Sequence, residues 1–403
     1  MADRRAFLRA AAAALAAGAS PLLSAPRIGP EGLPEGAIAA AEYDTLPGKL
    51  PLIKRTWRPP NYETPTRYFA EAFTPNDAFF VRYHLSNIPR VDLAQWRLQV
   101  GGEAAGRPVS FTLEELQRDF EAVEINALCL CSGNRRGLSD PHVPGIQWGH
   151  GAMGNARWKG VRLKALLEKA GIKAGATEVA FEGADGGVAE ATPDFVKSLP
   201  AWKALDENVL VAWEMNGEPL PHWNGFPARL VVPGWTATYW IKHLTSIQML
   251  AQPLRGFWMA PAYRIPKGRF PVVDRFVSQE NETNTPITEM VVNSLITNLR
   301  EGLPYRANSP LFVRGVAWDG GYGIERVEVS TDGGAIWRQA ELGPDLGRFS
   351  WRQFTHGFVP APGEHVVSAR AFNRLGATQT TTLVFNPAGY HNNVIQRIRI
   401  ACA

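Results

Sequence analysis

Short runs in which hydrophobic and polar residues alternate recur along the first 250 residues, and this pattern predicts a domain built mainly of β-strands. The predicted strands cover residues 79–83, 96–100, 123–128, 178–182, 209–214 and 240–250. Two other segments favour helices. Residues 112–119 open with the capping box Thr112-Leu113-Glu114-Glu115, and residues 163–170 end at Gly171. Strands and short helices mixed in this way predict the α+β class.

The pattern changes at a polar stretch, residues 277–286, which is typical of a domain boundary. Beyond it, residues 311–316, 324–330 and 365–372 favour strands, and Asp332-Gly333-Gly334 favours a hairpin turn. No helical period interrupts these strands. Short strands separated by regular turns predict an immunoglobulin-like β-sandwich of about a hundred residues.

The N-terminus has the features of an export signal. Arg4-Arg5-Ala6-Phe7-Leu8-Arg9 precedes a weakly apolar, alanine-rich run, and small residues near Ala19 and Ala25 suit cleavage. Paired arginines before Phe-Leu resemble the twin-arginine signal, although an ordinary secretory signal and a basic amphipathic helix share these features. The run is too short to span a bilayer. We therefore expect a protein that is exported already folded to the periplasm and is soluble there.

These patterns divide the chain into three predicted segments. Residues 1–25 form the twin-arginine signal peptide, residues 26–280 a larger α+β domain with an N-terminal arm, and residues 281–403 the β-sandwich. The arm, residues 26–76, is rich in Pro and Gly and shows no clear period. A chain of 403 residues is too long for one typical core, which agrees with two domains.

Composition and cysteine usage narrow the chemistry. The net charge of +4 comes without any basic run, so a nucleic-acid partner is not expected. The three cysteines do not make a disulfide framework, because a bridge between Cys129 and Cys131 would be strained and Cys402 lies at a chain end that we expect to be mobile. The sequence contains no Cys-x-x-Cys-His, so we expect no c-type haem on this chain.

The reactive side chains gather in the stretch 127–137, which follows a predicted strand. Cys131 offers a thiolate, which is a soft metal ligand and a strong nucleophile. A Gly133-Asn134 turn follows, and then Arg135 and Arg136, whose guanidinium groups suit an oxyanion or a phosphate. A metal ligand beside an anion site is one interpretation. A buried free cysteine followed by a basic turn is the other, and this stretch alone supports both about equally.

Other candidate residues lie at separate places along the chain. Arg82 and His84 alternate onto one face of a predicted strand, which suits an anionic ligand. Asp185 lies in a glycine-rich turn, where local features favour a structural role. Tyr263-Arg264 lies in an irregular stretch and pairs a phenol with a guanidinium, which suits the wall of a polar pocket. Each of these signals is weak when taken alone.

Taken together, the motifs resemble the sulfite oxidase family of molybdenum enzymes, most closely its exported bacterial sulfite dehydrogenases. The likeness covers nearly the whole mature chain and rests on six motifs in the family's order. They are Phe80-Val81-Arg82-Tyr83-His84, Cys131-Ser132-Gly133-Asn134-Arg135-Arg136, Gly154-Asn155-Ala156-Arg157-Trp158, Glu214-Met215-Asn216-Gly217, Gly225-Phe226-Pro227-Ala228-Arg229 and Ala262-Tyr263-Arg264. The resemblance implies a mixed α+β domain that binds molybdopterin, followed by an immunoglobulin-like domain. That second domain often forms a dimer contact in relatives, which leaves a homodimer open.

The resemblance also implies roles for individual residues. Cys131 matches the thiolate that ligates molybdenum, whereas Cys129 does not. The positions that match cofactor-binding residues are Val81, Arg82, His84, Cys131, Asp185, Asn224, Arg229 and Lys242. The positions that match the catalytic group around the metal and the substrate anion are Arg82, Cys131, Arg136 and Tyr263. The chain departs from the animal enzymes at Asn224, where they carry His. It also departs at residues 386–393, which contain no Arg where they supply one to the substrate pocket, so His391 is a candidate substitute.

The activity that the resemblance implies is the oxidation of sulfite to sulfate, with one molybdenum–molybdopterin per chain. Because the sequence has no haem, flavin or cytochrome b5 motif, we expect the electrons to pass singly to a separate periplasmic c-type cytochrome, as a subunit or a transient acceptor. A molybdopterin reductase of the same fold, acting on a sulfoxide or nitrate, is the first alternative. A non-catalytic secreted binding protein, in which Cys131 is an inert core thiol, is the second.

Substitution of the two neighbouring cysteines tests the proposed metal ligand. Cys131→Ser should abolish molybdenum-dependent activity, because a hydroxyl is a poor substitute for a soft thiolate ligand. Cys129→Ser should largely retain that activity. Activity and bound molybdenum are measured in both purified variants, and the reverse result would move the metal ligand to Cys129.

Overall fold

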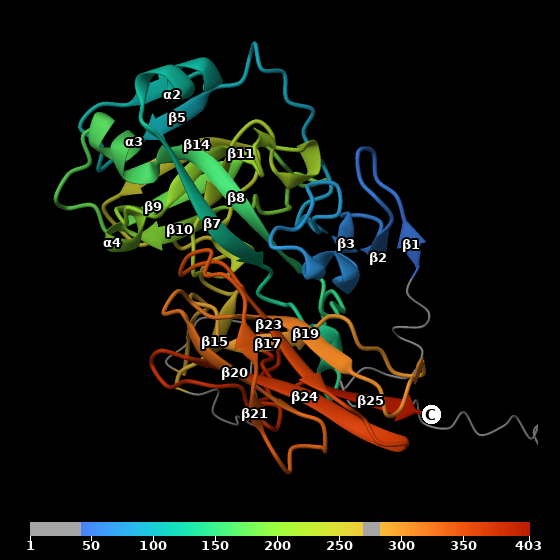
Figure 1. Ribbon diagram of the computed structural model, residues 1–403. Coiled ribbons are helices and arrows are strands. Elements are labelled where there is room, and N and C mark those ends of the chain that lie inside the picture. Colours follow the sequence, from blue (N-terminus) through green and yellow to red (C-terminus); the bar gives the residue numbers. More distant parts are fainter. Residues whose placement is uncertain (1–41, 269–282) are drawn as a thin grey trace, which may run out of the picture.

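The computed structural model describes residues 42–268 and 283–403, and their strands form two groups of β-sheets (Figure 1). The first group has three sheets and carries the α-helices of the described residues. The second group begins at residue 293 and has two sheets. This is the predicted α+β architecture followed by a β-sandwich. The expected signal peptide, and residues 277–282 of the polar stretch, lie outside the described residues.

The central sheet of the first group is built on the antiparallel pair β7 and β8. The strand order is β12-β11-β8-β7, and β13 also pairs with β11. The strands are β7 (Ala122–Leu130), β8 (Met153–Arg162), β11 (Leu210–Met215), β12 (Glu218–Pro219) and β13 (Arg229–Val231). The last four residues of β7 are buried, so the strand enters the core just before Cys131. Gly154 faces Cys129 across the ladder, and a Cβ there would lie 2.5 Å from the ring of Phe79, so only glycine fits.

A second sheet has the order β10-β9-β14-β5-β6, with β14 parallel to β5. Its strands are β5 (Leu98–Gly101), β6 (Val109–Phe111), β9 (Glu178–Gly183), β10 (Lys197–Pro200) and β14 (Leu244–Leu250). Both predicted helices are confirmed. The helix α2 (Leu113–Asp119) begins with a complete capping box between Thr112 and Glu115, and α3 (Leu163–Lys169) ends before Gly171, which has φ of 68°. They cover the end that points away from the C-terminal sheets (Figure 1).

The remaining helical elements of the described residues are short. They are α4 (Ala201–Ala204) and the 3₁₀ turns η1 (Thr66–Ala70), η2 (Arg136–Leu138), η3 (His222–Asn224) and η4 (Ala237–Tyr239). Across residues 42–268 and 283–403, no helix combines the length and the apolar character that a bilayer crossing requires.

A small sheet at the N-terminal side, with the order β1-β2-β3-β4, differs from the irregular arm that the sequence predicts. Its strands are β1 (Tyr43–Asp44), β2 (Leu52–Thr56), β3 (Asn61–Glu63) and β4 (Val81–Arg82). Strands this short show no recognisable period of two. Two other predicted strands are shortened. Residues 79–83 contribute only β4, and the strand predicted at 240–250 begins at Leu244, because His243 takes φ of 49° and interrupts the extended backbone.

The second group of sheets is a β-sandwich with the strand orders β17-β19-β23-β22 and β18-β25-β24-β20-β21. Its strands are β17 (Asn293–Ile296), β18 (Pro304–Tyr305), β19 (Leu311–Trp318), β20 (Ile324–Ser330), β21 (Arg338–Gln339), β22 (Glu341–Leu342), β23 (Arg352–Phe358), β24 (Gly363–Asn373) and β25 (Arg397–Cys402). One apolar core joins the sheets, with Val313 from the first and Val327 from the second. The predicted strands appear as β19, β20 and β24. The expectation for Cys402 was wrong, because β25 pairs with β24 and buries this thiol.

Apolar packing and hydrogen bonds join the two groups of sheets. Leu128 of β7 packs in one cluster with Leu295 and Trp318 of the sandwich. The guanidinium of Arg135 is buried at the junction and donates to Asn293 Oδ1 at 2.8 Å and to Val394 O at 2.7 Å. The pair β15 (Arg264–Pro266) and β16 (Asn284–Pro286) lies between the two groups in the sequence.

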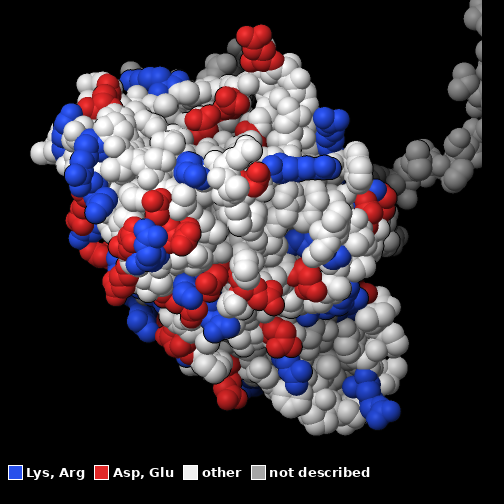
Figure 2. Space-filling view, turned by 90° about the horizontal axis from the view of Figure 1, so that it is seen from above, with Lys and Arg blue, Asp and Glu red and all other residues white. Residues whose placement is uncertain are grey.

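The face seen in Figure 2 carries interspersed acidic and basic side chains.

The contribution of this junction to stability is testable at Arg135. Arg135→Met should lower the free energy of unfolding by about 3 kcal/mol, because it removes two charge-assisted hydrogen bonds and leaves Val394 O without this donor. Thermal unfolding of the purified protein measures the change. Arg157→Met is the control, since Arg157 is exposed and its loss should cost less than about 0.5 kcal/mol. Equal midpoints for the two variants would contradict a stabilising role of the junction.

Candidate active site

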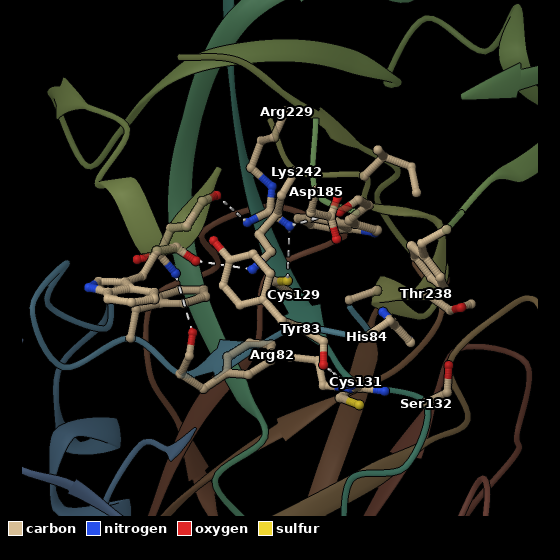
Figure 3. Close-up of a pocket in the computed structure, with 18 of the residues that line it drawn as sticks. Arg82, Tyr83, His84, Cys129, Cys131, Ser132, Asp185, Arg229, Thr238 and Lys242 are labelled. Atoms are coloured by element: carbon tan, nitrogen blue, oxygen red, sulfur yellow. Dashed lines mark hydrogen bonds between the residues drawn. The ribbon is translucent and has the colours of Figure 1, made fainter. Parts of the chain in front are cut away.

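One pocket lies where the ends of strands from all three sheets of the first group converge (Figure 3). Its wall combines aromatic rings with a few charged and polar side chains, which is typical of a ligand site. Its lining residues are Phe79, Phe80, Arg82, Tyr83, His84, Cys129, Cys131, Ser132, Asp185, Phe195, Trp223, Asn224, Arg229, Ala237, Thr238, Trp240, Ile241, Lys242 and Tyr263. They come from segments almost two hundred residues apart in the sequence.

Eight of the ten site residues that the sequence predicts line this pocket. They are Arg82, His84, Cys131, Asp185, Asn224, Arg229, Lys242 and Tyr263. Val81 lies instead in a small apolar cluster with Leu52 and Tyr62, on the other face of the strand β4. Arg136 also lies outside the lining residues, and its guanidinium lies against the ring of Tyr390.

Two thiols line the pocket near the end of β7. Cys131 follows the strand directly, and its backbone N–H donates to Ala152 O at 2.9 Å, which holds the residue against β8. Cys129, two residues earlier, accepts a hydrogen bond from Arg229 Nη2 at 3.9 Å. Burial raises the pKa of the Cys129 thiol to about 11, although Arg229 opposes the shift, so this thiol is neutral near pH 7.

Positive charge gathers at the other end of the pocket, where Figure 3 places Arg229, Lys242 and Asp185 away from Cys131 and Ser132. Burial lowers the pKa of both Arg229 and Lys242, and Asp185 partly offsets the shift at Lys242. Burial also raises the pKa of Asp185 itself, which Lys242 opposes. With Arg82, three cationic side chains therefore face one carboxylate, and the pocket favours an anionic ligand.

Backbone carbonyl groups hold these cations in place. Arg229 donates from Nη1 to Asn224 O at 2.9 Å and from Nη2 to Trp240 O at 3.2 Å. The Lys242 ammonium donates to Trp223 O at 3.2 Å. Gly225 lies between the two cationic residues with φ of 115°, and a Cβ on it would lie 3.1 Å from the Cβ atoms of both Arg229 and Lys242. A glycine is thus needed here for both the conformation and the spacing.

Tyr263 and His84 form a hydrogen-bonded pair at the pocket wall, between the phenol oxygen and Nε2. The imidazole ring stacks on Phe195 with centroids 3.6 Å apart. Burial lowers the pKa of His84 well below its usual value, and Arg82, Lys242 and Lys197 add to the shift, so this imidazole is neutral. Burial raises the pKa of Tyr263, which therefore remains a phenol near neutral pH. The pair can exchange or donate a proton without carrying a charge.

Arg136 connects this pair to the C-terminal part of the chain. Its Nε donates to Ala388 O at 2.8 Å and its Nη1 to Ile146 O at 3.2 Å. Its guanidinium lies 5.2 Å from the ring centroid of Tyr390, which stacks on Tyr263 at 5.7 Å and an interplanar angle of 11°. The C-terminal segment therefore reaches the site through an aromatic ring.

His391, the candidate substitute for the missing arginine, is not among the lining residues. Burial lowers the pKa of this imidazole to about 4, so it is neutral near pH 7. The residue that contacts the Tyr263 ring is its neighbour Tyr390. Tyr390, like His391, is not among the lining residues.

Sequence reasoning missed several residues that shape the site. Lys49, from the predicted arm, is buried and donates to Asn224 Oδ1 and Asn76 O, each at 2.6 Å, and to Phe79 O at 3.1 Å. It holds the Asn224 side chain in the pocket wall. Lys49 carries no motif that would have revealed this role. Tyr83 and Ser132, by contrast, lie inside the motifs already singled out, and adjacency to them was a usable signal.

The pocket residues fit a molybdopterin-type cofactor. Three buried polar atoms among the lining residues, Ser132 Oγ, Arg229 Nε and Thr238 Oγ1, have no hydrogen-bond partner within the described chain. Buried polar groups are normally satisfied, so these three atoms indicate a polar ligand. Excess positive charge suits a phosphate, and the Cys131 thiol suits a soft metal. Arg229 and Lys242 would hold the anionic end of such a cofactor, and Cys131 its metal.

Comparison with known proteins agrees with this fit. A family model described as the oxidoreductase molybdopterin binding domain matches residues 84–258. A second, described as the Mo-co oxidoreductase dimerisation domain, matches residues 284–403. The fold and the site therefore define a molybdopterin-binding oxidoreductase.

The relatives identify the family. Chicken sulfite oxidase (Gallus gallus) is 35% identical over 325 residues, which cover 78% of this chain and 69% of that protein. Rat mitochondrial sulfite oxidase (Rattus norvegicus) is 35% identical over 313 residues, which cover 75% of this chain and 56% of that protein. The chain belongs to the sulfite oxidase family, and it spans little more than half the length of the rat relative. The crystal structure of the sulfane dehydrogenase SoxCD from Paracoccus pantotrophus matches with a TM-score of 0.74 and 26% identity, covering 96% of this chain and 98% of that one.

Lys49 also predicts how stability depends on pH. Burial lowers its pKa to about 7 in the folded state, from 10.5. Between these values the unfolded chain binds one more proton, so the free energy of unfolding should rise with pH, by up to about 1.4 kcal/mol per pH unit. Below pH 7 this contribution is flat, because both states are protonated there.

Thermal unfolding of the protein and of Lys49→Met, at several pH values from about 6 to 9, checks this slope. The free energy of unfolding of the unchanged protein, minus that of Lys49→Met, should increase with pH above the folded-state pKa of Lys49. Lys173→Met, at an exposed lysine, is the control and should show a pH-independent difference. If the difference for Lys49→Met also stayed constant with pH, burial would not lower the pKa of Lys49.

Proposed function

We propose that this protein oxidises sulfite to sulfate and passes the electrons singly to a c-type cytochrome. The observation that carries the proposal is the pocket with cationic walls, in which the Cys131 thiol directly follows β7 and a neutral phenol–imidazole pair lies at the wall. The 35% identity to chicken and rat sulfite oxidases supports sulfite as the substrate. Sulfite is doubly negative once deprotonated, so it matches the charge of the pocket.

When bound, the molybdenum–molybdopterin cofactor supplies the two-electron redox chemistry. The residues of the protein hold the cofactor and orient the substrate. Arg229 and Lys242 would bind the anionic end of the cofactor, and Cys131 would ligate its metal through a thiolate. Asn224, fixed by Lys49, would shape the wall beside Arg229. The residues that line the pocket come from all three sheets of the first group, so the site forms when this whole part of the chain folds.

Substrate handling falls to the residues around Tyr263. Arg82 and Arg136 both oppose the rise in the pKa of Tyr263, so their positive charge acts at the phenol. A sulfite anion beside the phenol would experience the same field and would be concentrated and oriented by it. When His84 Nε2 carries the proton, it donates to the Tyr263 oxygen. The phenol hydrogen is then free to donate to a sulfite oxygen and to stabilise charge that develops there.

We further propose a periplasmic location, supported by Arg4-Arg5 and the segment that follows it, and a c-type cytochrome as the electron acceptor. The match of residues 284–403 to a dimerisation domain supports a homodimer. A second substrate class comes from the solved SoxCD structure, whose title names a sulfane dehydrogenase and which covers nearly the whole chain. A sulfane-sulfur compound is therefore the main competing substrate.

One assay separates these functions. Protein purified from the periplasm is analysed for molybdenum and is then mixed with oxidised cytochrome c and sulfite. We expect molybdenum in equal amount to the chain and cytochrome reduction that depends on sulfite and is lost in Cys131→Ser. The parallel reactions use a sulfane-sulfur compound with cytochrome c, and nitrate or a sulfoxide with a reduced dye.

Turnover of the sulfane compound but not of sulfite would replace the substrate and keep the enzyme class. Reduction of nitrate or of a sulfoxide, without sulfite oxidation, would make the protein a reductase of the same fold. Absence of molybdenum from protein made with an intact cofactor supply would remove the proposal.

A further inference from the structure

A buried lysine lies behind the Tyr263–His84 pair, outside the pocket lining. Lys197, at the start of β10, is 1% exposed. Its ammonium donates to Trp258 O at 2.7 Å and lies 5.0 Å from the ring centroid of Tyr263 and 4.8 Å from that of Tyr239. Among the described residues it forms no ion pair. The cation is thus held by one carbonyl group and two aromatic rings.

Stability does not explain a lysine at this position. Burial lowers the pKa of Lys197 to about 7; Arg264 adds to the shift and Glu178 opposes it. A buried charge without a counter-ion is costly, and an apolar side chain of similar volume is often neutral or stabilising in such a place. The chain keeps a destabilising group here, which points to a role in the adjoining site.

Lys197 contacts both ends of the segment 258–263, because it hydrogen-bonds to Trp258 and lies over the ring of Tyr263. Its hydrogen bond fixes Trp258, whose ring packs against His84 at 5.3 Å, and its charge lies over the Tyr263 ring. Tyr263 takes φ of 59°, a conformation that a bulky residue rarely adopts without support. The attraction between a cation and an aromatic ring is worth more when both are desolvated, as they are here. Lys197 therefore supports the strained residue from behind.

We propose that Lys197 is a positioning residue, which holds the Tyr263 phenol against His84 from outside the pocket. The proposal deepens the proposed function, and it rests on that function only for the step in which Tyr263 acts on the substrate. The charged groups that act on Lys197 are Arg264 on β15 and Glu178 on β9, and Lys197 in turn acts on the neutral His84. Arg229 and Lys242 are not among the groups that Lys197 contacts, so replacing it leaves these two cations in place.

The test uses the purified holoenzyme with Lys197→Met, Lys197→Arg and a matched control, Lys203→Met. Lys203 is also a buried lysine near an aromatic ring, 5.7 Å from the Trp235 ring centroid, but it pairs with Asp206 at 2.7 Å and does not contact Tyr263. Three readouts are taken: hydrogen–deuterium exchange of the peptide that spans residues 257–264, the thermal midpoint, and kcat and KM for sulfite with cytochrome c.

In Lys197→Met we expect the amides of Met259, Ala260 and Ala262 to exchange about tenfold faster, because they are protected by hydrogen bonds within the segment that Lys197 fixes. The midpoint should stay the same or rise. The kcat should fall about tenfold while KM changes by less than about twofold, since only the placement of Tyr263 is lost. Lys197→Arg should recover part of kcat. Lys203→Met should change neither exchange in this peptide nor kcat.

Unchanged exchange and unchanged kcat in Lys197→Met would overturn the inference. The inference would also be overturned if Lys197→Met and Lys203→Met both lowered the thermal midpoint and kcat, because a general loss of packing would then explain the effect. If sulfite turnover is absent in every form while exchange rises only in Lys197→Met, the positioning role stands and the proposed function fails. If sulfite turnover is present but exchange stays the same, the proposed function stands and this inference fails.

Discussion

The burial of positive charge without enough negative charge is the constraint on which the rest of this structure depends. Arg229 and Lys242 are buried in the pocket, where Asp185 is the one carboxylate among the described lining residues, and burial lowers the pKa of both cations. Such an arrangement costs free energy unless a ligand completes it. Much of the surrounding architecture serves to meet this cost. Carbonyl groups of Asn224, Trp223 and Trp240 accept from the cations, and three sheets end at the same place to deliver them. The fold is thus prepared for an anionic cofactor.

The sandwich is also part of this site. Arg135 ties the turn after Cys131 to Asn293 and Val394, and the next residue, Arg136, hydrogen-bonds to Ala388. Tyr390 then stacks on Tyr263. Two consecutive arginines therefore connect the thiol segment with the C-terminal segment, one at the junction of the sheets and one behind the phenol. Guanidinium groups suit this work because their donors form a rigid, planar set. The C-terminal segment therefore contacts both Arg136 and Tyr263.

The sequence predicts much of the site but less of its support. Cys131 comes shortly after one predicted strand, Arg82 lies in another and His84 follows it, and all three carry distinctive chemistry, so both their position and their nature were visible. Lys49, Lys197 and Tyr390 were not predicted. Each acts through contacts between segments far apart in the chain, and nothing in its local sequence distinguishes it from a surface lysine or a core tyrosine. The strands were predicted best where they are long, as at β7 and β24, and least where two to five residues form the N-terminal sheet. The conformation of His243, which ends the predicted strand early, depends on its burial beside Tyr83 and Phe226.

The pKa shifts of the basic groups in and beside the pocket share one direction and one main origin. His84, Lys197 and Lys242 all lose affinity for protons through burial, and other cations add to the shift at each of them. The cavity therefore resists further positive charge while it holds only its own side chains. An anion bound beside Arg229 and Lys242 would reverse the electrostatic part of these shifts, because it favours the charged form of each neighbouring base. Binding of an anionic cofactor and proton uptake are consequently linked. Of these three groups, Lys197 is the one nearest to a change of charge at neutral pH, because burial lowers its pKa to about 7 in the fold. The pKa of His84 lies well below its ordinary value, so this imidazole needs a larger opposing shift before it takes up a proton and changes its hydrogen bond with Tyr263.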